Sequence, residues 1–192
     1  MKIIGITGSI GCGKTYLANI IKSLGFCVYN PDIWTRRLYN KRDFLDIIYQ
    51  NFPQVFENQV FNKRKLRNLV FSDNNQLKKL ENIIHPLLKK ELKRLINKQA
   101  IKEELLFLDV ALLMEMRWDK YCDYIIVADC DKETQIQRVM QRDKVNRDDV
   151  IKIISAQTDN KVKIENADYV INTMLSEGVN RVQLINFIQE IM

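Results

Sequence analysis

The chain has 192 residues, of which 46% are hydrophobic and 28% are charged. This length fits one domain, or one domain with an inserted lobe, and the composition excludes a disordered chain and a fibrous repeat. The net charge of +6 fits anionic partners, such as nucleic acid or a polyphosphate ligand, but a solvated basic surface explains it equally well.

Membrane and disulfide-rich classes are not expected. No segment approaches the roughly 18 consecutive apolar residues of a membrane span, and the N-terminus lacks the layout of a signal peptide, so we expect a cytoplasmic protein. Cys12, Cys27, Cys122 and Cys130 are scattered and His85 is the single histidine. No ligand set for structural zinc is apparent, and we expect reduced thiols.

The N-terminal segment predicts a βαβ unit. The short, β-branched run Lys2–Thr7 is typical of a buried parallel strand. From Lys14 onward apolar residues recur at helical spacing until Gly25, which suits a helix end, and Phe26–Tyr29 reads as a second strand. The crossover between the two strands is expected to be right-handed.

Residues 33–100 show helical periodicity and no convincing strand, which predicts a helical insertion. Pro86 removes a backbone donor inside this region. We therefore expect one helix to end near Ile84 or His85, and another to begin with the proline in its first turn.

The remaining chain alternates strands with helices. Apolar runs predict strands at Leu105–Val110, Tyr124–Ala128 and Tyr169–Ile171, with a helix between or around the first two. Further helices are predicted at Lys132–Arg142, Arg147–Gln157 and Val179–Ile191. This order predicts an α/β fold, an open and doubly wound sheet of five parallel strands with a helical lobe inserted after the second strand.

Gly8–Thr15 (GSIGCGKT) carries the phosphate-binding pattern G-x-x-x-x-G-K-[ST] between the first predicted strand and helix. Glycines permit positive φ angles, which turn N–H groups inward around phosphate oxygens, and the helix N-terminus adds a favourable dipole. Lys14 can then place a charge on the β- and γ-phosphates, and the Thr15 hydroxyl can bind Mg²⁺. A structural turn that binds nothing is the alternative, which this context disfavours.

Asp32 follows the second predicted strand, in the sequence Asn30-Pro31-Asp32. Since the carboxyl ends of neighbouring parallel strands share one crevice, we expect Asp32 to face the phosphates. There it could accept the proton of an attacking hydroxyl or hold Mg²⁺ through water. The alternative, which is compatible with both roles, is that it caps the helix that follows.

Asp109 stands at the end of the apolar run Leu105–Leu108, in the position of a Walker-B carboxylate that would approach Mg²⁺ directly or through water. Capping a following helix is at least as good an interpretation. Glu115 is a less specific acidic candidate.

Arg138 and Arg142 are four residues apart and share a predicted helix face, with Arg147 just beyond. Planar guanidinium groups can clamp transferring phosphates and stack on a base. The alternative is a solvent-facing stripe paired with nearby aspartates, namely Asp143, Asp148 and Asp149.

Two nucleotide- and nucleic-acid-binding classes are disfavoured. Asn160–Lys163 (NKVK) lacks the aspartate of the guanine-reading N-K-x-D box, and no D-x-x-G follows the third predicted strand. Aromatic residues are not interleaved with the basic residues of 89–98, so no nucleic-acid-binding signature is present.

From end to end, the chain resembles the dephospho-coenzyme A kinase family of P-loop enzymes, which phosphorylate the ribose 3′-hydroxyl of dephospho-CoA. The resemblance rests on an ordered set of segments: IGITGSIGCGKT, Asn30-Pro31-Asp32, Asn62–Asp73, Leu80–Pro86, Asp109–Glu115 (DVALLME), Glu133–Asp143, Gln157 and Ala167–Asn172 (ADYVIN). Three positions depart from the family pattern: Asn30 replaces the first aspartate of a pair, Ala111 replaces a proline, and Asn58-Gln59 lacks a common glycine.

The resemblance implies a single P-loop kinase domain over residues 1–192, with a CoA-binding lobe at about 33–100 and a lid at about 138–157. Asp32 takes the place of the family's catalytic aspartate. His85 would lie near the acceptor, although capping a helix at Pro86 explains it about as well.

We therefore expect a kinase that transfers the γ-phosphoryl group of ATP to dephospho-CoA, with Mg²⁺ as cofactor. The expected catalytic residues are Asp32, Lys14, Arg138 and Arg142. The expected ATP-binding residues are Gly8, Ser9, Ile10, Gly11, Cys12, Gly13, Lys14, Thr15 and Tyr16, with Thr15 on the metal and Asp32 and His85 at the acceptor.

Two alternatives remain open. The first is a kinase of another nucleoside or small metabolite, and the second is a nucleotide-dependent switch with a protein partner. We expect no nucleic acid, membrane or obligate protein partner.

Overall fold

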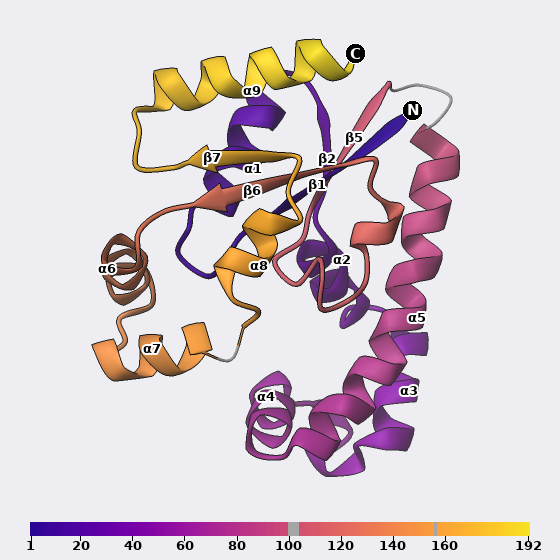
Figure 1. Ribbon diagram of the computed structural model, residues 1–192. Helices are drawn as coiled ribbons and strands as arrows, with labels where there is room; N and C mark the ends of the chain where they lie inside the picture. The colour runs from indigo at the N-terminus through magenta and orange to yellow at the C-terminus, as the bar shows by residue number, and fades with distance from the viewer. Residues whose placement is uncertain (100–103, 156) are drawn as a thin grey trace. The chain divides into compact units, whose positions relative to one another are not determined.

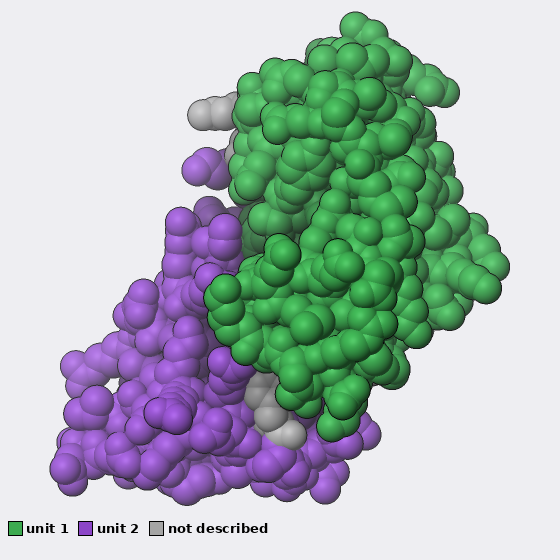
Figure 2. All heavy atoms as spheres, turned by 90° about the vertical axis from the view of Figure 1, so that its left-hand side faces the viewer, with its two compact units in different colours: residues 1–30, 99–192 green, residues 31–98 purple. Residues whose placement is uncertain are grey.

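The structure is a computed structural model that describes residues 1–99, 104–155 and 157–192. It divides into two compact units, residues 1–30 with 99–192 and residues 31–98, which Figure 2 shows in different colours. Residue 100, the expected end of the insertion, and residue 156, inside the predicted helix Arg147–Gln157, lie outside the described residues.

In the described part of the chain, the first unit contains a five-stranded sheet in the order β2-β5-β1-β6-β7, in which every neighbouring pair is parallel (Figure 1). The strands are β1 (Lys2–Thr7), β2 (Cys27–Tyr29), β5 (Leu105–Asp109), β6 (Tyr124–Asp129) and β7 (Tyr169–Asn172). The five predicted strands and the α/β fold are thus confirmed. The carboxyl ends of β1 and β5, which pair directly, lie at one edge of the sheet.

Helices α1 (Lys14–Ser23) and α9 (Glu177–Ile191) cover one face of this sheet (Figure 1). Alternate strand residues such as Ile4 and Ile6 form a buried cluster with Leu17 of α1 and Leu184 of α9. The strand residues that alternate with those of this cluster, such as Leu106 and Val127, are buried as well. Burial on both faces explains why the strands are continuous apolar runs.

The described residues between β5 and β6 form no α-helix. This differs from the prediction of a helix between or around the two strands. The connection forms turns and one short 3-10 helix, η2 (Asp119–Tyr121). Its apolar residues Leu113 and Trp118 are fully buried, and a Cβ atom added to Gly5 would lie 2.7 Å from Leu113. Their apolar character therefore serves packing on the sheet.

Among the described residues, three helices lie between β6 and β7. Helix α6 (Lys132–Asp143) and helix α7 (Arg147–Ser155) match the predictions closely, whereas α8 (Asn160–Glu165) was not predicted. Asp131 and Asp159 cap α6 and α8 by accepting backbone hydrogen bonds.

The second unit is mostly helical, with its own buried core. Its helices are α2 (Pro31–Leu38), α3 (Arg42–Asn51), the 3-10 helix η1 (Pro53–Val55), α4 (Lys63–Ser72) and α5 (Asn74–Gln99, of which residue 99 belongs to the first unit). The expectation of no strand was wrong, because β3 (Phe56–Glu57) and β4 (Val60–Phe61) form an antiparallel hairpin. Both turn residues, Asn58 and Gln59, have positive φ angles, as a two-residue hairpin turn of type I′ requires.

The expected break at Pro86 was also wrong, because α5 runs through the proline. Proline in a helix interior removes one hydrogen bond and clashes with the preceding turn. The helix continues because its apolar stripe packs on both sides of the proline: Leu80 is buried in the core of the second unit, and Ile84 and Leu87 pack against it. No helix of the described residues combines the length and apolarity that crossing a membrane requires.

Replacing Pro86 by alanine should stabilise α5. Alanine restores a hydrogen bond to the Asn82 carbonyl and removes the steric clash, which together stabilise the folded state by about 3 kcal/mol. Loss of the proline also makes the unfolded chain more flexible, which offsets about 1 kcal/mol of this gain. We expect the free energy of unfolding, measured in urea by circular dichroism, to rise by about 2 kcal/mol. Lys90→Ala, an exposed change on the same helix, should shift it by less than about 0.5 kcal/mol. An unchanged or lower value for Pro86→Ala would contradict this account.

Candidate active site

The loop between β1 and α1 has the backbone geometry of an anion cage. Gly11 and Gly13 have φ angles of 81° and 89°, and a Cβ atom on Gly11 would lie 2.7 Å from the Gln135 carbonyl oxygen. Gly13 caps α1 without any side-chain hydrogen bond. The first N–H groups of α1 therefore have no partner from the helix or its cap, and they are free to bind an anion.

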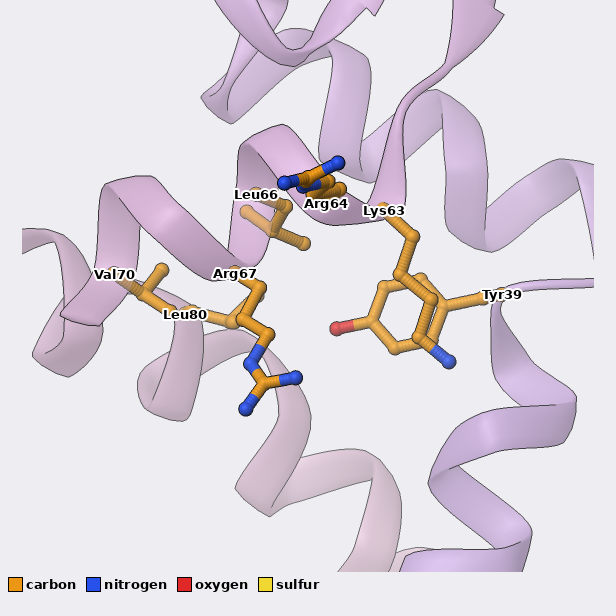
Figure 3. A pocket seen from close by; sticks show the side chains of 7 residues that line it. All are labelled: Tyr39, Lys63, Arg64, Leu66, Arg67, Val70 and Leu80. Atoms are coloured by element: carbon orange, nitrogen blue, oxygen red, sulfur yellow. The ribbon is translucent and has the colours of Figure 1, made fainter. Parts of the chain in front are cut away.

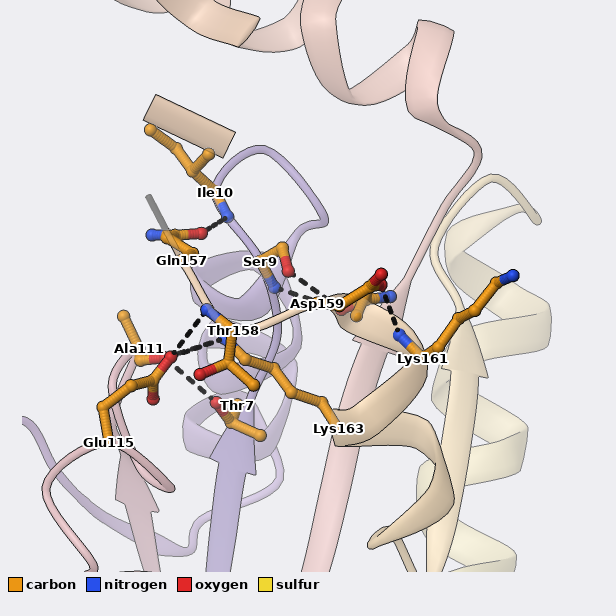
Figure 4. Close-up of polar contacts among 11 residues, drawn as sticks. Thr7, Ser9, Ile10, Ala111, Glu115, Gln157, Thr158, Asp159, Lys161 and Lys163 are labelled. Atoms are coloured by element: carbon orange, nitrogen blue, oxygen red, sulfur yellow. Dashed lines mark hydrogen bonds and ion pairs between the residues drawn. The ribbon is translucent and has the colours of Figure 1, made fainter. Parts of the chain in front are cut away.

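The first half of the loop is held by side chains of the protein itself (Figure 4). The Ser9 N–H donates to Asn160 Oδ1 at 3.4 Å, and the Ile10 N–H donates to Gln157 Oε1 at 2.9 Å. Ser9 and Ile10, which we expected to bind nucleotide, thus use their N–H groups to anchor the loop. The open N–H groups lie at the α1 end of the loop.

Thr173, directly after β7, joins the loop to α6. Its hydroxyl donates to the Cys12 carbonyl at 2.9 Å. The Arg138 guanidinium donates to the hydroxyl and to the carbonyl of Thr173, both at 2.9 Å, and to the Gly11 carbonyl at 3.4 Å. These contacts fix Arg138 beside the loop.

A cavity of about 520 Å³ opens beside Arg138. It is lined by Gly13, Tyr16, Arg138, Thr173, Met174, Leu175 and Glu177. Apolar side chains next to a planar cation suit a flat aromatic heterocycle. Because Gly13 belongs both to this cavity and to the open end of the loop, a nucleotide could place its base here and its phosphates on the N–H groups.

Arg142 and Arg147 are engaged elsewhere. Arg142 makes two hydrogen bonds of 2.8 Å to its neighbour Asp143, and Arg147 makes two of 2.8 Å to Glu133. Both arginine side chains are more than half exposed. In this structure they have the solvent-facing pairing that the sequence left as the alternative, although Arg147 pairs with Glu133 rather than with a nearby aspartate.

Lys14, Asp109 and Asn30 form a polar cluster beside the loop. The Lys14 ammonium pairs with the Asp109 carboxylate, which also accepts a hydrogen bond of 2.6 Å from Asn30 Nδ2. The Asp109 side chain is 2% exposed, and its backbone lies opposite Ile6 in the sheet. The capping interpretation of Asp109 was wrong, since turns and not a helix follow it. Asn30 fits here because an amide can donate to Asp109, whereas a carboxylate would repel it.

Sequence reasoning missed a buried ion pair near the loop (Figure 4). Lys163 of α8 is fully buried, and its Nζ lies 3.5 Å from Glu115 Oε1 and 3.4 Å from the Ala111 carbonyl oxygen. Burial opposes ionisation of Glu115, but hydrogen bonds, including those from Thr158, and the Lys163 charge together hold its pKa below the usual value. The segment Asn160–Lys163 is mostly polar, and nothing in its sequence indicates that Lys163 is buried.

Two candidate residues belong to the second unit. Asp32 lies in the first turn of α2 and not at its N-cap, because the helix already begins at Pro31. His85 is half-buried inside α5, so the suggestion that it caps a helix starting at Pro86 was wrong. The roles of Asp32 and His85 toward a substrate stay predictions.

The second unit contains a cavity of about 500 Å³ (Figure 3). Leu66, Val70 and Leu80 give it an apolar floor, the Tyr39 hydroxyl points into it, and Lys63, Arg64 and Arg67 surround it. Burial raises the pKa of Tyr39, so the phenol remains a neutral hydrogen-bond donor. Such a cavity suits a ligand with an apolar body and an anionic group.

Replacing Glu115 by glutamine should destabilise the protein by about 2 kcal/mol, because the Lys163 charge stays buried without its counter-ion. Adding Lys163→Met should recover most of this loss. Because the folded pKa of Glu115 is lowered, its stabilisation is complete above the ordinary value of 4.5 and is lost as the pH falls through the folded value. The difference between wild type and Glu115→Gln, measured by urea unfolding, should therefore close in acid. Equal stabilities at pH 7 would contradict the importance of this pair.

Comparisons with known proteins agree with these features. The family model of dephospho-CoA kinase matches residues 2–177. The dephospho-CoA kinase of Bartonella quintana (strain Toulouse) is 36% identical over 174 residues, which cover 90% of this chain and 89% of that protein. That of Fusobacterium nucleatum is 35% identical over 185 residues, covering 94% and 95%. The solved structure of dephospho-CoA kinase from Campylobacter jejuni is 25% identical with a TM-score of 0.73, covering 100% of this chain and 98% of that one. The chain belongs to the dephospho-CoA kinase family.

Proposed function

We propose that this protein transfers the γ-phosphoryl group of ATP to the ribose 3′-hydroxyl of dephospho-CoA, giving CoA and ADP in the last step of coenzyme A biosynthesis. The observation that carries the proposal is the anion cage with its open N–H groups and Lys14, in a chain of this family. Small-molecule substrates and a cytoplasmic location follow from the same proposal.

ATP would bind with its phosphates on the N–H groups at the α1 end of the loop and its adenine in the cavity beside Arg138. Lys14 would exchange the Asp109 carboxylate for the β- and γ-phosphates. The Arg138 guanidinium, already fixed beside the loop, would stack on the base or neutralise charge during transfer. Arg142 would have to give up Asp143 before it could contact a phosphate, as a lid over residues 138–157 would allow.

Mg²⁺ fits the oxygen atoms available at this site. Thr15 is exposed, and its hydroxyl makes no hydrogen bond within the described residues; the Asp109 carboxylate lies beside Lys14. Hard cations of this kind prefer such oxygen ligands. When bound, Mg²⁺ would neutralise the charge that develops on the phosphates; Thr15 would bind it directly, and Asp109 would hold it directly or through water.

Asp32 is the residue that we assign to the acceptor hydroxyl. It follows Asn30 by two residues, so their Cα atoms lie within about 7 Å of each other. Asn30, which donates to Asp109, supports this assignment by its neighbourhood in the sequence. The carboxylate would orient the 3′-hydroxyl and accept its proton as the γ-phosphoryl group is transferred.

The insertion would bind the rest of the acceptor. The diphosphate of dephospho-CoA carries negative charge, and its pantetheine arm presents methylene and dimethyl groups between its amides. The apolar floor and the surrounding cations of the second unit's cavity suit this combination. The arm would lie on Leu66 and Val70, and Arg64 would pair with the diphosphate. His85 is a further expected acceptor contact.

A kinase of another nucleoside or small metabolite is the alternative. A coupled assay of ADP formation with ATP and Mg²⁺ distinguishes the two. We expect turnover with dephospho-CoA and little with nucleosides or nucleoside monophosphates. A preference for one of the latter, or ATP hydrolysis that needs no acceptor, would contradict the proposal.

Replacing Asp32 by asparagine should lower kcat at least 100-fold with little change in the KM for ATP, because the acceptor loses its proton acceptor. Asp43→Asn is the matched control, since Asp43 also lies in the first turn of a helix of the second unit. It should keep kcat within about twofold. If Asp32→Asn retained most of kcat, Asp32 would have only a helix-stabilising role.

Replacing Arg64 by glutamine should raise the KM for dephospho-CoA about 5- to 10-fold and leave the KM for ATP unchanged, because one charged contact to the diphosphate is lost. Lys65→Gln is the control: Lys65 is the next residue, pairs with Glu57 and does not line the cavity. An equal effect of the two variants on the KM for dephospho-CoA would show that only overall charge matters.

A further inference from the structure

Two cysteines meet at the phosphate loop. The Cys12 and Cys130 sulfur atoms are 3.6 Å apart and share a hydrogen bond. Cys12 lies between Gly11 and Gly13 in the loop, and Cys130 follows β6 directly. The Cys130 thiol also lies 4.0 Å from the Gly11 carbonyl oxygen. The two residues are 118 positions apart in the chain, so the fold itself brings their sulfur atoms together.

The two thiols are chemically unequal. Their shared hydrogen bond, with burial, raises the pKa of Cys12. The same hydrogen bond lowers the pKa of Cys130, and the nearby Arg138 charge adds to this effect against burial and the two acidic neighbours Asp129 and Asp131. Cys130 is therefore the better nucleophile, and Cys12 is a protonated thiol beside it.

A small oxidant can reach this pair. Cys130 lines a cavity of about 490 Å³, together with Ser9, Gln135 and Asn160. Cys130 is 9% exposed and Cys12 is 1% exposed. Because Cys130 lines this cavity and Cys12 does not, a reagent that enters the cavity meets Cys130 first. This cavity is separate from the one beside Arg138 to which we assign adenine.

We propose that Cys12 and Cys130 form an oxidative modification site that takes a peroxide and closes to a disulfide. The Cys130 thiolate attacks one peroxide oxygen, the O–O bond breaks, and a sulfenic acid and hydroxide form. The Cys12 sulfur then attacks the Cys130 sulfur, the S–O bond breaks, and the oxygen leaves as water with the Cys12 proton. Two thiols are thereby oxidised, and hydrogen peroxide is reduced to two water molecules.

Closure would displace the loop. A disulfide requires a sulfur separation of about 2.04 Å, so the two sulfur atoms, now 3.6 Å apart, must approach each other by about 1.6 Å. Cys12 is held at its carbonyl by Thr173 and flanked by glycines with positive φ angles, so the strain falls on the loop backbone. The N–H groups at the α1 end then lose their alignment for phosphate. The disulfide form should have at least tenfold lower activity.

The test treats the full chain, without nucleotide, with a small molar excess of hydrogen peroxide. We expect mass spectrometry of unreduced peptides to detect the Cys12–Cys130 linkage, together with a loss of kinase activity that dithiothreitol reverses. The linkage is a readout that does not depend on the identity of the substrate. Failure to find it while other cysteines become oxidised would overturn the proposal, whatever the protein phosphorylates.

Variants locate the effect. Cys130→Ser should keep untreated activity within about twofold, form no linkage and resist peroxide, and Cys130→Ala should do the same if serine disturbs folding. Cys27→Ser and Cys122→Ser retain the pair and should respond like wild type. Peroxide inactivation of both Cys130 variants at the wild-type rate would overturn the proposal.

Discussion

The phosphate loop keeps its shape because segments far along the chain hold its backbone. Several N–H groups aimed at one point repel one another, and a glycine-rich segment has many other conformations. Asn160 and Gln157 bind the N–H groups at its start, while Thr173 and Arg138 bind its carbonyl groups. With the backbone held in this way, the cage is preorganised and needs no reorganisation when an anion arrives.

The two units have different roles with respect to this loop. The described side chains that hold the loop belong to the first unit, namely Asn160, Gln157, Thr173 and Arg138. The same unit holds Lys163, whose buried charge ties α8 to Glu115. The second unit has its own apolar core around Phe44 and Ile48 and carries the cavity assigned to the acceptor. Substitutions that adapt the second unit to the proposed acceptor therefore need not disturb the phosphate loop of the first unit.

The sequence predicted the strands and the loop because both depend on local patterns. Apolar runs and the glycine-lysine motif keep their meaning whatever surrounds them. It did not predict the contacts of Thr173 or Lys163, because the type of a polar residue does not indicate which distant residues it will contact. The β3–β4 hairpin was missed because strands of two residues are too short to show periodicity. The helix break predicted at Pro86 was wrong because packing along α5 outweighs the local effect of the proline.

The pairing of Lys14 with Asp109 has a thermodynamic consequence. While the two are joined, each neutralises the other. In the proposed ATP complex, a polyphosphate that draws Lys14 away would leave Asp109 with an uncompensated negative charge, and this charge would attract a divalent cation. Nucleotide and cation would thus strengthen each other's binding, and by linkage the coupling free energy would be the same whichever of them binds first.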